Sequence, residues 1–100
     1  MIIVEGYVRL SGPDEVKRLL PAATNQIAAS KAEGPCIDYT YAVDLLDPCI
    51  IRVLEKWESW EGLEAHFAQP HMTVWRAALT SVKFEERSLC AHEVTESRDV

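Results

Sequence analysis

The sequence predicts an α+β domain in which a four-stranded antiparallel sheet carries its helices on one face. Three observations lead to this prediction. Four segments alternate apolar and polar residues with a period of two, which is typical of strands. The stretches between them repeat apolar residues every three or four positions, as amphipathic helices do. The chain has 100 residues, the size of one domain, and 48% of them are hydrophobic, which is enough for a core.

The first two predicted elements are a strand over Ile2 to Leu10 and a helix of about 20 residues after it. In the strand, residues of one parity are apolar or Gly, and those of the other parity are Ile, Glu, Tyr and Arg. Ser11 is expected to cap the helix, and Pro13 suits its first turn, where an N–H group would have no partner. Pro21 is expected to kink the helix, and Gly34 to end it.

A hairpin is predicted next. Residues Ile37 to Val43 alternate, with Tyr39 and Tyr41 on one face, and Cys49 to Trp57 form a further run of strand type. Residues 44–48 between them end in Asp-Pro, a strong turn signal. The two strands are therefore expected to be neighbours joined by a somewhat long loop.

The second helical region is predicted in two pieces. Ser59 is expected to cap a short helix, and Pro70 starts a second segment, because proline interrupts a helix but fits its first turn. Lys83 to Leu89 alternates and is predicted as the fourth strand, which residues from Ser88 onward could extend. Residues 95–100 are polar and are expected to fray.

The predicted element order is therefore β-α-β-β-α-β. This is the order of the ferredoxin-like fold, a four-stranded antiparallel sheet with both helices on one face. The other face has no cover from this chain and is expected to carry apolar groups from several strands. A second copy packed sheet against sheet would cover it, so we expect a homodimer, a dimeric α/β-barrel. The whole chain, residues 1–100, is expected to form one domain.

The composition limits the partners and the location. A net charge of −6 without a basic run disfavours nucleic acid and anionic membranes, because both are bound through Lys and Arg. No apolar stretch approaches the roughly 18 residues of a membrane span, and the N-terminal run is interpreted as a strand rather than a signal peptide. The three cysteines form no CxxC pair, which is typical of free thiols in a reducing compartment, so a cytoplasmic location is expected.

Three short runs carry a resemblance to a known family. They are Val53-Leu54-Glu55-Lys56-Trp57-Glu58-Ser59, Leu63-Glu64-Ala65-His66-Phe67 and Pro70-His71-Met72. With them, the chain resembles the antibiotic biosynthesis monooxygenase family, and within it the bacterial quinol monooxygenase-like proteins. The order and length of the first strand, the long helix and the following strand agree as well. The resemblance covers about residues 1 to 90.

The resemblance implies an oxygenase that works without flavin, haem or metal. Such family members act on quinols, anthrones and related phenols, whose anions are electron-rich enough to reduce O2. The protein then has to supply a base, a dry pocket and orientation. The sequence agrees, since it has no Gly-rich dinucleotide loop and no metal-ligand motif. It departs from the anthrone oxygenases, which carry Asn four residues before the Trp, where this chain has Val53.

His66, His71 and Trp57 are the candidate catalytic residues. Imidazole titrates near neutral pH, so either histidine could take a phenolic proton and return it. The alternative is that both histidines are structural groups at the helix break near Pro70. Trp57 matches a family Trp that borders the substrate cavity in several members. It would stack on an aromatic substrate, or it would anchor the sheet to the helix that follows.

The candidate substrate-binding residues are Tyr39, Tyr41, Phe67, Met72 and Trp75. The tyrosine hydroxyls could bond a quinol oxygen if their strand face looks at the helices, whereas they would be interface residues if it looks at a second copy. The other three follow the helical stripe and are either core residues or a pocket wall. Glu55 and Glu58 are expected to be solvated or paired.

The predicted function is a cofactor-independent monooxygenase that acts on a quinol or a similar phenol with O2. The first alternative is a non-catalytic dimer that binds a quinone or another metabolite. The second alternative keeps the fold and changes the chemistry to that of an isomerase. Only the first function consumes O2 in a way that depends on both substrate and protein.

Overall fold

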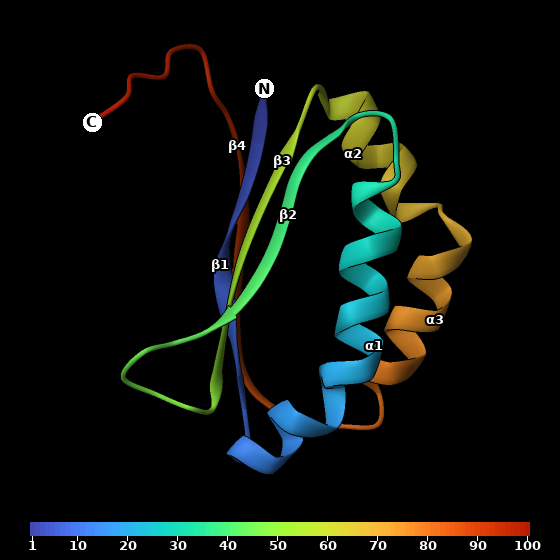
Figure 1. Cartoon of the computed structure of the whole chain (residues 1–100), viewed down its shortest axis with the longest axis vertical. Coiled ribbons are helices and arrows are strands. Elements are labelled where there is room, and N and C mark those ends of the chain that lie inside the picture. The colour runs from blue at the N-terminus through green and yellow to red at the C-terminus, as the bar shows by residue number, and fades with distance from the viewer.

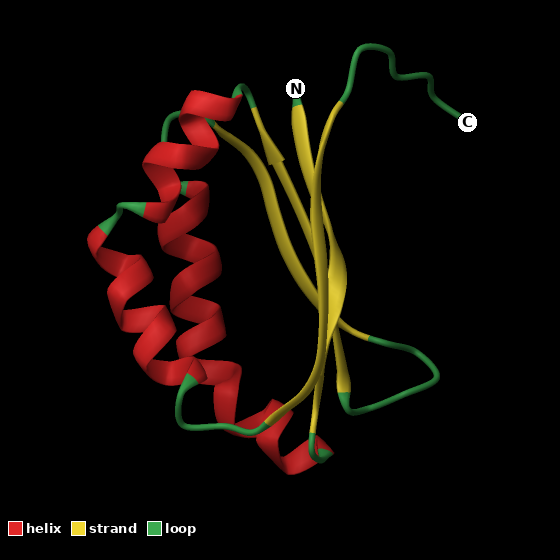
Figure 2. Cartoon of the chain, turned by 180° about the vertical axis from the view of Figure 1, so that it is seen from behind, coloured by secondary structure: helices red, strands yellow, loops and turns green.

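The computed structural model describes residues 1–100. Its elements are, in chain order, β1 (Ile2–Leu10), α1 (Pro13–Lys31), β2 (Cys36–Val43), β3 (Ile50–Trp57), α2 (Trp60–Phe67), α3 (Pro70–Leu79) and β4 (Phe84–Glu93). The strands form one antiparallel sheet in the order β2-β3-β1-β4. The helices all lie on one face of it, and the other face is bare (Figures 1 and 2). The predicted α+β, ferredoxin-like fold is confirmed, with its second helical region divided into α2 and α3.

The N-terminus of α1 differs from the prediction. Its N-cap residue is Gly12, and no side chain caps the helix, so the expectation for Ser11 was wrong. Asp14 and Glu15 lie in the first turn, where negative charge stabilises the positive end of the helix dipole. The helix runs through Pro21, and Figure 1 shows its axis changing direction near the N-terminal end, as a proline kink would produce. Neither α1 nor any other helix is long and apolar enough to cross a membrane.

The core lies between the helices and the inner face of the sheet. Two clusters of buried apolar side chains fill it: Ile2, Val4, Tyr39, Trp57 and Leu63, and then Leu10, Leu19 and Ile51. Trp57 is fully enclosed at the end of β3, where it joins the sheet to α2. Burying an apolar side chain of this kind contributes about 2–3 kcal/mol. Tyr39 pairs in register with Glu55, so both side chains point toward the helices.

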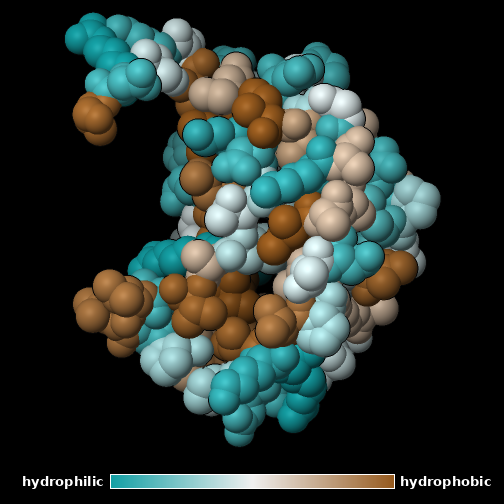
Figure 3. Space-filling model, viewed as in Figure 1, coloured by the Kyte–Doolittle hydropathy of each residue, from teal (hydrophilic) through white to brown (hydrophobic).

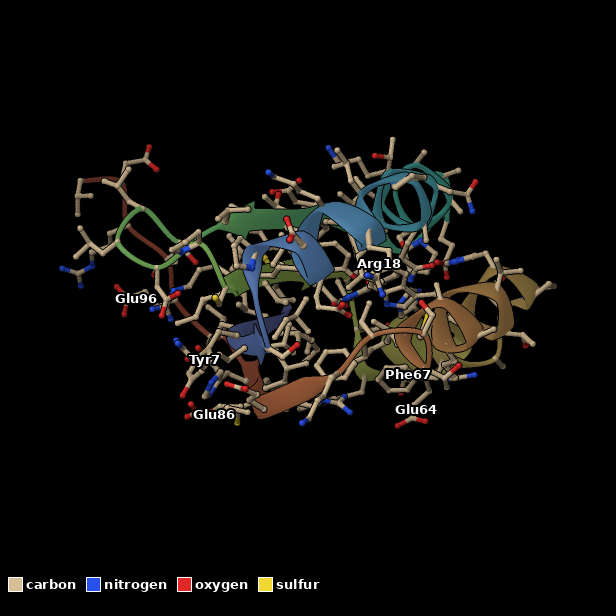
Figure 4. All side chains as sticks on the ribbon, turned by 90° about the horizontal axis from the view of Figure 1, so that it is seen from below. Tyr7, Arg18, Glu64, Phe67, Glu86 and Glu96 are labelled. Carbon is tan, nitrogen blue, oxygen red and sulfur yellow. The ribbon has the colours of Figure 1, made fainter.

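The outer face of the sheet carries apolar and polar side chains together. It carries Leu54, which is 38% exposed, but polar side chains lie around it. Tyr7 donates a hydrogen bond to Glu86, and the two lie together on the side away from the helices (Figure 4). The Arg52 guanidinium lies 5.2 Å from the centre of the Tyr7 ring. The strand alternation holds, but the outward positions contain many charged residues.

Two segments project beyond this outer face. The loop between β2 and β3 carries Leu45 and Leu46, which are 96% and 92% exposed. The C-terminal segment after Glu93 has no helix or strand and extends from the opposite end of the sheet (Figure 1). Figure 3 shows the molecule hollowed between these two projections, with hydrophobic side chains at the loop. The outer face is therefore the floor of a shallow concavity.

Candidate active site

A cavity of about 900 Å³ lies between the sheet and the helices. Its size falls in the range of small-molecule sites, and most of the residues that line it are hydrophobic. All four strands contribute to one wall, and α2 and α3 form much of the other. Six of the eight predicted site residues line it: Tyr39, Tyr41, His66, Phe67, Met72 and Trp75.

His66 is the candidate base that the helices present to this cavity. It lies in the last turn of α2. Ser59 is the N-cap of this helix, and its hydroxyl accepts a hydrogen bond from the N–H of Gly62 at 3.1 Å. The His66 Nδ1 atom is 2.7 Å from a carboxylate oxygen of Glu33, while Nε2 makes no hydrogen bond within the chain. Because the carboxylate can only accept, Nδ1 carries the hydrogen, and the lone pair of Nε2 is free. Carboxylate, imidazole and open Nε2 form the arrangement of a general base.

Burial controls the protonation of His66. Only 1% of its surface is exposed, and burial lowers the pKa of the imidazole below its ordinary value of 6.5. The hydrogen bond and the negative charge of Glu33 oppose this shift and raise the pKa. The lowering prevails, so His66 is neutral near pH 7 and can accept a proton.

His71 lies on the other side of Glu33, not in the cavity with His66. Its Nε2 atom is 2.9 Å from the same Glu33 oxygen, and its Nδ1 atom is 2.8 Å from the side-chain amide oxygen Oε1 of Gln26. His71 borders a second, smaller hollow of about 350 Å³ near the end of α1. Of the two candidate bases, only His66 therefore lines the larger cavity.

Glu33, His66 and His71 are the residues that could hold a metal ion. One ligand atom from each lies within 4.8 Å of the others, although no sequence motif predicted this group. Two His and one carboxylate would suit several transition metals by ligand type. However, the Glu33 oxygen is 2.7 and 2.9 Å from the two nitrogens, whereas two ligands around one tetrahedral ion are about 3.3 Å apart. The observed geometry is that of hydrogen bonds.

The two tyrosines face the helices, which decides between the alternatives left open by the sequence. Their hydroxyls are 2.6 Å apart, and Gln26 Nε2 donates to the Tyr39 hydroxyl at 3.3 Å. Burial raises the pKa of Tyr39 to about 12 and raises that of Tyr41 as well, so both stay protonated. The Tyr41 ring stacks on Trp75 at a centroid distance of 5.6 Å. These hydroxyls can therefore bond a substrate oxygen at the polar end of an aromatic-walled cavity.

Trp57 supports the cavity from behind and does not line it. Its ring lies 4.5 Å from the His66 ring and 6.3 Å from the Tyr39 ring, measured between centroids. The indole N–H donates to a carboxylate oxygen of Glu55 at 3.0 Å. In this structure Trp57 packs against the groups that face the cavity. Its ring has no exposed face, so a substrate ring cannot stack on it in the way that the sequence predicted.

Glu55 and Glu33 are site residues that the sequence analysis missed. Glu55 is 8% exposed and lines the cavity, so it is neither solvated nor paired with a cation. A signal was available, because the period of two places Glu55 on the same strand face as Trp57. Glu33 offered no such signal, since it is 33 positions before His66 and only the fold brings them together.

The family model described as antibiotic biosynthesis monooxygenase matches residues 1–78 of the chain. The chain belongs to this family. The matched range contains Glu33, Glu55, His66 and His71, while β4, which closes one side of the cavity, lies beyond it. No curated protein matches the chain significantly.

Solved structures agree with membership of the antibiotic biosynthesis monooxygenase family at the level of the fold. Several carry the description "putative antibiotic biosynthesis monooxygenase", including the following two. One, from Deinococcus radiodurans, is 23% identical with a TM-score of 0.89 and covers 100% of this chain and 98% of its own. The other, from Nitrosomonas europaea, is 15% identical with a TM-score of 0.86 and covers 96% and 100%. A conserved protein from Methanosarcina mazei is 22% identical with a TM-score of 0.84 and covers 94% and 92%.

Proposed function

We propose that this protein is a cofactor-independent monooxygenase that oxidises a quinol or a related electron-rich phenol with O2. The observation that carries the proposal is His66, a buried imidazole with Nδ1 held by Glu33 and Nε2 free in a mainly apolar cavity. A base of this kind can remove a phenolic proton. The resulting phenolate, poorly solvated in such a cavity, is a stronger one-electron donor to O2 than the phenol.

The remaining side chains would orient the substrate. Phe67, Met72 and Trp75 present apolar surface to the ring, and Phe67 is 45% exposed at the rim. Tyr39 and Tyr41 keep their protons; one hydroxyl donates to the other, and the remaining O–H can donate to a substrate oxygen. Holding the ring between these groups brings its hydroxyl to His66, and positioning of this type lowers the barrier substantially.

Oxygen consumption tests the proposed function. The protein is mixed with a panel of reduced quinols and phenols, with and without a chelator, and compared with a blank without protein. Protein-dependent O2 uptake that survives the chelator is expected. Uptake that the chelator abolishes would assign the chemistry to a metal at Glu33, His66 and His71. No uptake across the panel would contradict the proposal. Saturable binding would then favour the metabolite-binding dimer, and product formation without O2 the isomerase.

The pH dependence of kcat/KM should report His66. Because burial lowers the pKa of His66, activity should fall only when the pH drops below that pKa, so the acid limb should lie below pH 6.5. Glu33→Gln removes a charge that raises this pKa, so the limb should move to lower pH while the plateau rate falls about tenfold. The control is Glu64→Gln, an exposed change on α2. If the acid limb of Glu33→Gln lies at the same pH as that of the wild type, Glu33 does not act on the base.

We also propose that a second copy of the chain covers the outer face of the sheet. The concave shape supports this assembly. The exposed Leu45 and Leu46, and Leu54 in the middle of β3, support it as well. The cysteines form no disulfide, which suits a reducing cytoplasm.

The assembly can be tested by placing a charge on that face. Leu54→Glu should weaken the dimer about a hundredfold or more, because an unpaired charge is costly to bury. Leu20→Glu is the control, since Leu20 is 65% exposed on α1, on the opposite side of the molecule. Sedimentation velocity measures both variants. A stable wild-type monomer, or a Leu54→Glu dimer as tight as that of Leu20→Glu, would contradict the proposed interface.

A further inference from the structure

Glu55 is the only acidic side chain that lines the cavity. It projects from β3 opposite Tyr39 of β2 and Val4 of β1. No Lys, Arg or His forms an ion pair with it, although eight such pairs occur elsewhere in the chain. A carboxyl buried without a cation is unusual, because the charged form is expensive to remove from water. Its position calls for a functional explanation.

The two oxygens of Glu55 have different surroundings. Oε1 accepts the hydrogen bond from the Trp57 indole at 3.0 Å. Oε2 has no hydrogen-bond partner in the chain. Oε2 is also not fully buried, because the Ser30 hydroxyl is the only fully buried side-chain polar atom that lacks a hydrogen-bond partner. Oε2 is therefore the oxygen that faces the cavity.

Burial favours the protonated form of this carboxyl. It raises the pKa of Glu55 from 4.5 to about 7, although the Trp57 hydrogen bond opposes the shift, and the charge of Glu33 adds slightly to it. The other ionisable groups that line the cavity are Tyr39 and Tyr41 on β2, His66 on α2, Arg76 on α3, and Arg87 and Cys90 on β4. A large fraction of Glu55 is protonated near pH 7, so the sheet presents a proton donor while the helices present a base.

We propose that Glu55 is a second catalytic residue, which donates its proton to the outer oxygen of a substrate hydroperoxide so that the O–O bond breaks and water leaves. This inference rests on the proposed monooxygenase function. Trp57 connects the two catalytic groups, since its ring centre lies 4.5 Å from that of His66 and its N–H donates to Glu55. Because His66 is on the helix wall and Glu55 on the sheet wall, a ring bound between the walls meets both.

The steps balance for a quinol that has a free ring C–H next to a hydroxyl. His66 takes the phenolic proton, and the anion and O2 combine into a peroxide at that carbon. The peroxide recovers the proton from His66 and becomes a hydroperoxide. Glu55 then donates a proton to the outer oxygen while His66 takes the C–H proton, the O–O bond breaks, and a C=O bond and water form. The proton on His66 returns to Glu55.

The overall reaction converts quinol and O2 into hydroxyquinone and water. O2 accepts four electrons, and all of them come from the quinol. Without the proton from Glu55, the hydroxide would be a poor leaving group in a cavity with little water. The intermediate would instead release hydrogen peroxide and the unhydroxylated quinone, which is the two-electron oxidation of the same substrate.

Glu55→Gln is the decisive variant. The amide oxygen can still accept the Trp57 hydrogen bond and the shape is retained, but an amide cannot supply a proton at neutral pH. We expect O2 uptake within about threefold of the wild type, with products shifted from hydroxyquinone to quinone and with close to one hydrogen peroxide per O2. Glu58→Gln, an exposed change beyond the end of β3, is the matched control and should stay coupled to water. Full coupling in Glu55→Gln would overturn the proposal.

Thermal unfolding tests the protonation of Glu55 independently of turnover. A raised pKa in the folded state means that its contribution to stability is complete below pH 4.5 and is lost as the pH rises to about 7. Glu55→Gln should therefore match the wild type near pH 4 and exceed its Tm by about 5 °C or more at pH 8. An equal Tm difference at both pH values would show that folding does not raise the pKa of Glu55, so that the group is ionised near pH 7, and would overturn its role as donor. Wild-type protein without O2 uptake would instead overturn the oxygenase itself, whatever the Tm values show.

Discussion

Replacing His66 with alanine is expected to lower kcat at least about a hundredfold, because the cavity then has no neutral base to take the phenolic proton. The other titratable groups cannot substitute for it. Burial keeps Tyr39 and Tyr41 protonated, and Glu55 is partly protonated at neutral pH. Initial rates of O2 uptake at saturating quinol measure the effect.

A second substitution separates loss of the base from loss of structure. In His66→Asn, the amide nitrogen can replace Nδ1 as the donor to Glu33, but no basic nitrogen faces the cavity. It should be as inactive as His66→Ala, and free imidazole should restore part of the rate to the alanine variant. His71→Ala should lose less activity, since His71 lies outside the cavity. Full activity in His66→Ala, His71→Ala and the double variant would show that neither histidine is the base.

Gly6→Ala is expected to destabilise the fold by about 4 kcal/mol or more, or to prevent folding. Gly6 lies in the middle of β1 with φ at +142°, a backbone conformation that L-residues with side chains rarely adopt. A Cβ atom there would stand 1.8 Å from the carbonyl oxygen of Ser88 on β4. That oxygen belongs to backbone and cannot rotate away, so β1 and β4 would have to separate. Urea unfolding followed by circular dichroism measures the loss.

Gly12→Ala is the control for this prediction. Gly12 has an extended backbone with φ at −174°, and no atom lies within 4 Å of the Cβ position. Its loss of stability should stay below about 1 kcal/mol, the effect of a poorer N-cap residue. Equal losses in the two variants would show that the contact between Gly6 and β4 is not the cause.

The strands of this protein could be predicted from its sequence because their signal is local. A period of two places Tyr39 with Tyr41, and Glu55 with Trp57, on common faces whatever the rest of the chain does. The same local rule holds for Pro70, which separates α2 from α3 as proline does in any chain. Family membership was also visible in short contiguous runs around Trp57 and His66.

Local patterns could not say which strand face meets the helices. Tyr39 and Tyr41 became cavity residues only because α1, α2 and α3 all pack on their side of the sheet. The charge of Glu55 was misleading for the same reason. Acidic residues are mostly exposed, and only the closed sheet-helix sandwich shows that this one is enclosed.

The sequence alone therefore determined the elements, their order and the family, together with His66 and the tyrosines as candidates. Tertiary structure decided the chemistry of the site. The C-terminal end of α1 brings Glu33 to His66, turns His71 away into a second hollow, and leaves Nε2 of His66 free in the cavity. The physical reason is that a hydrogen bond acts over about 3 Å in space, and distance along the chain carries no information about it.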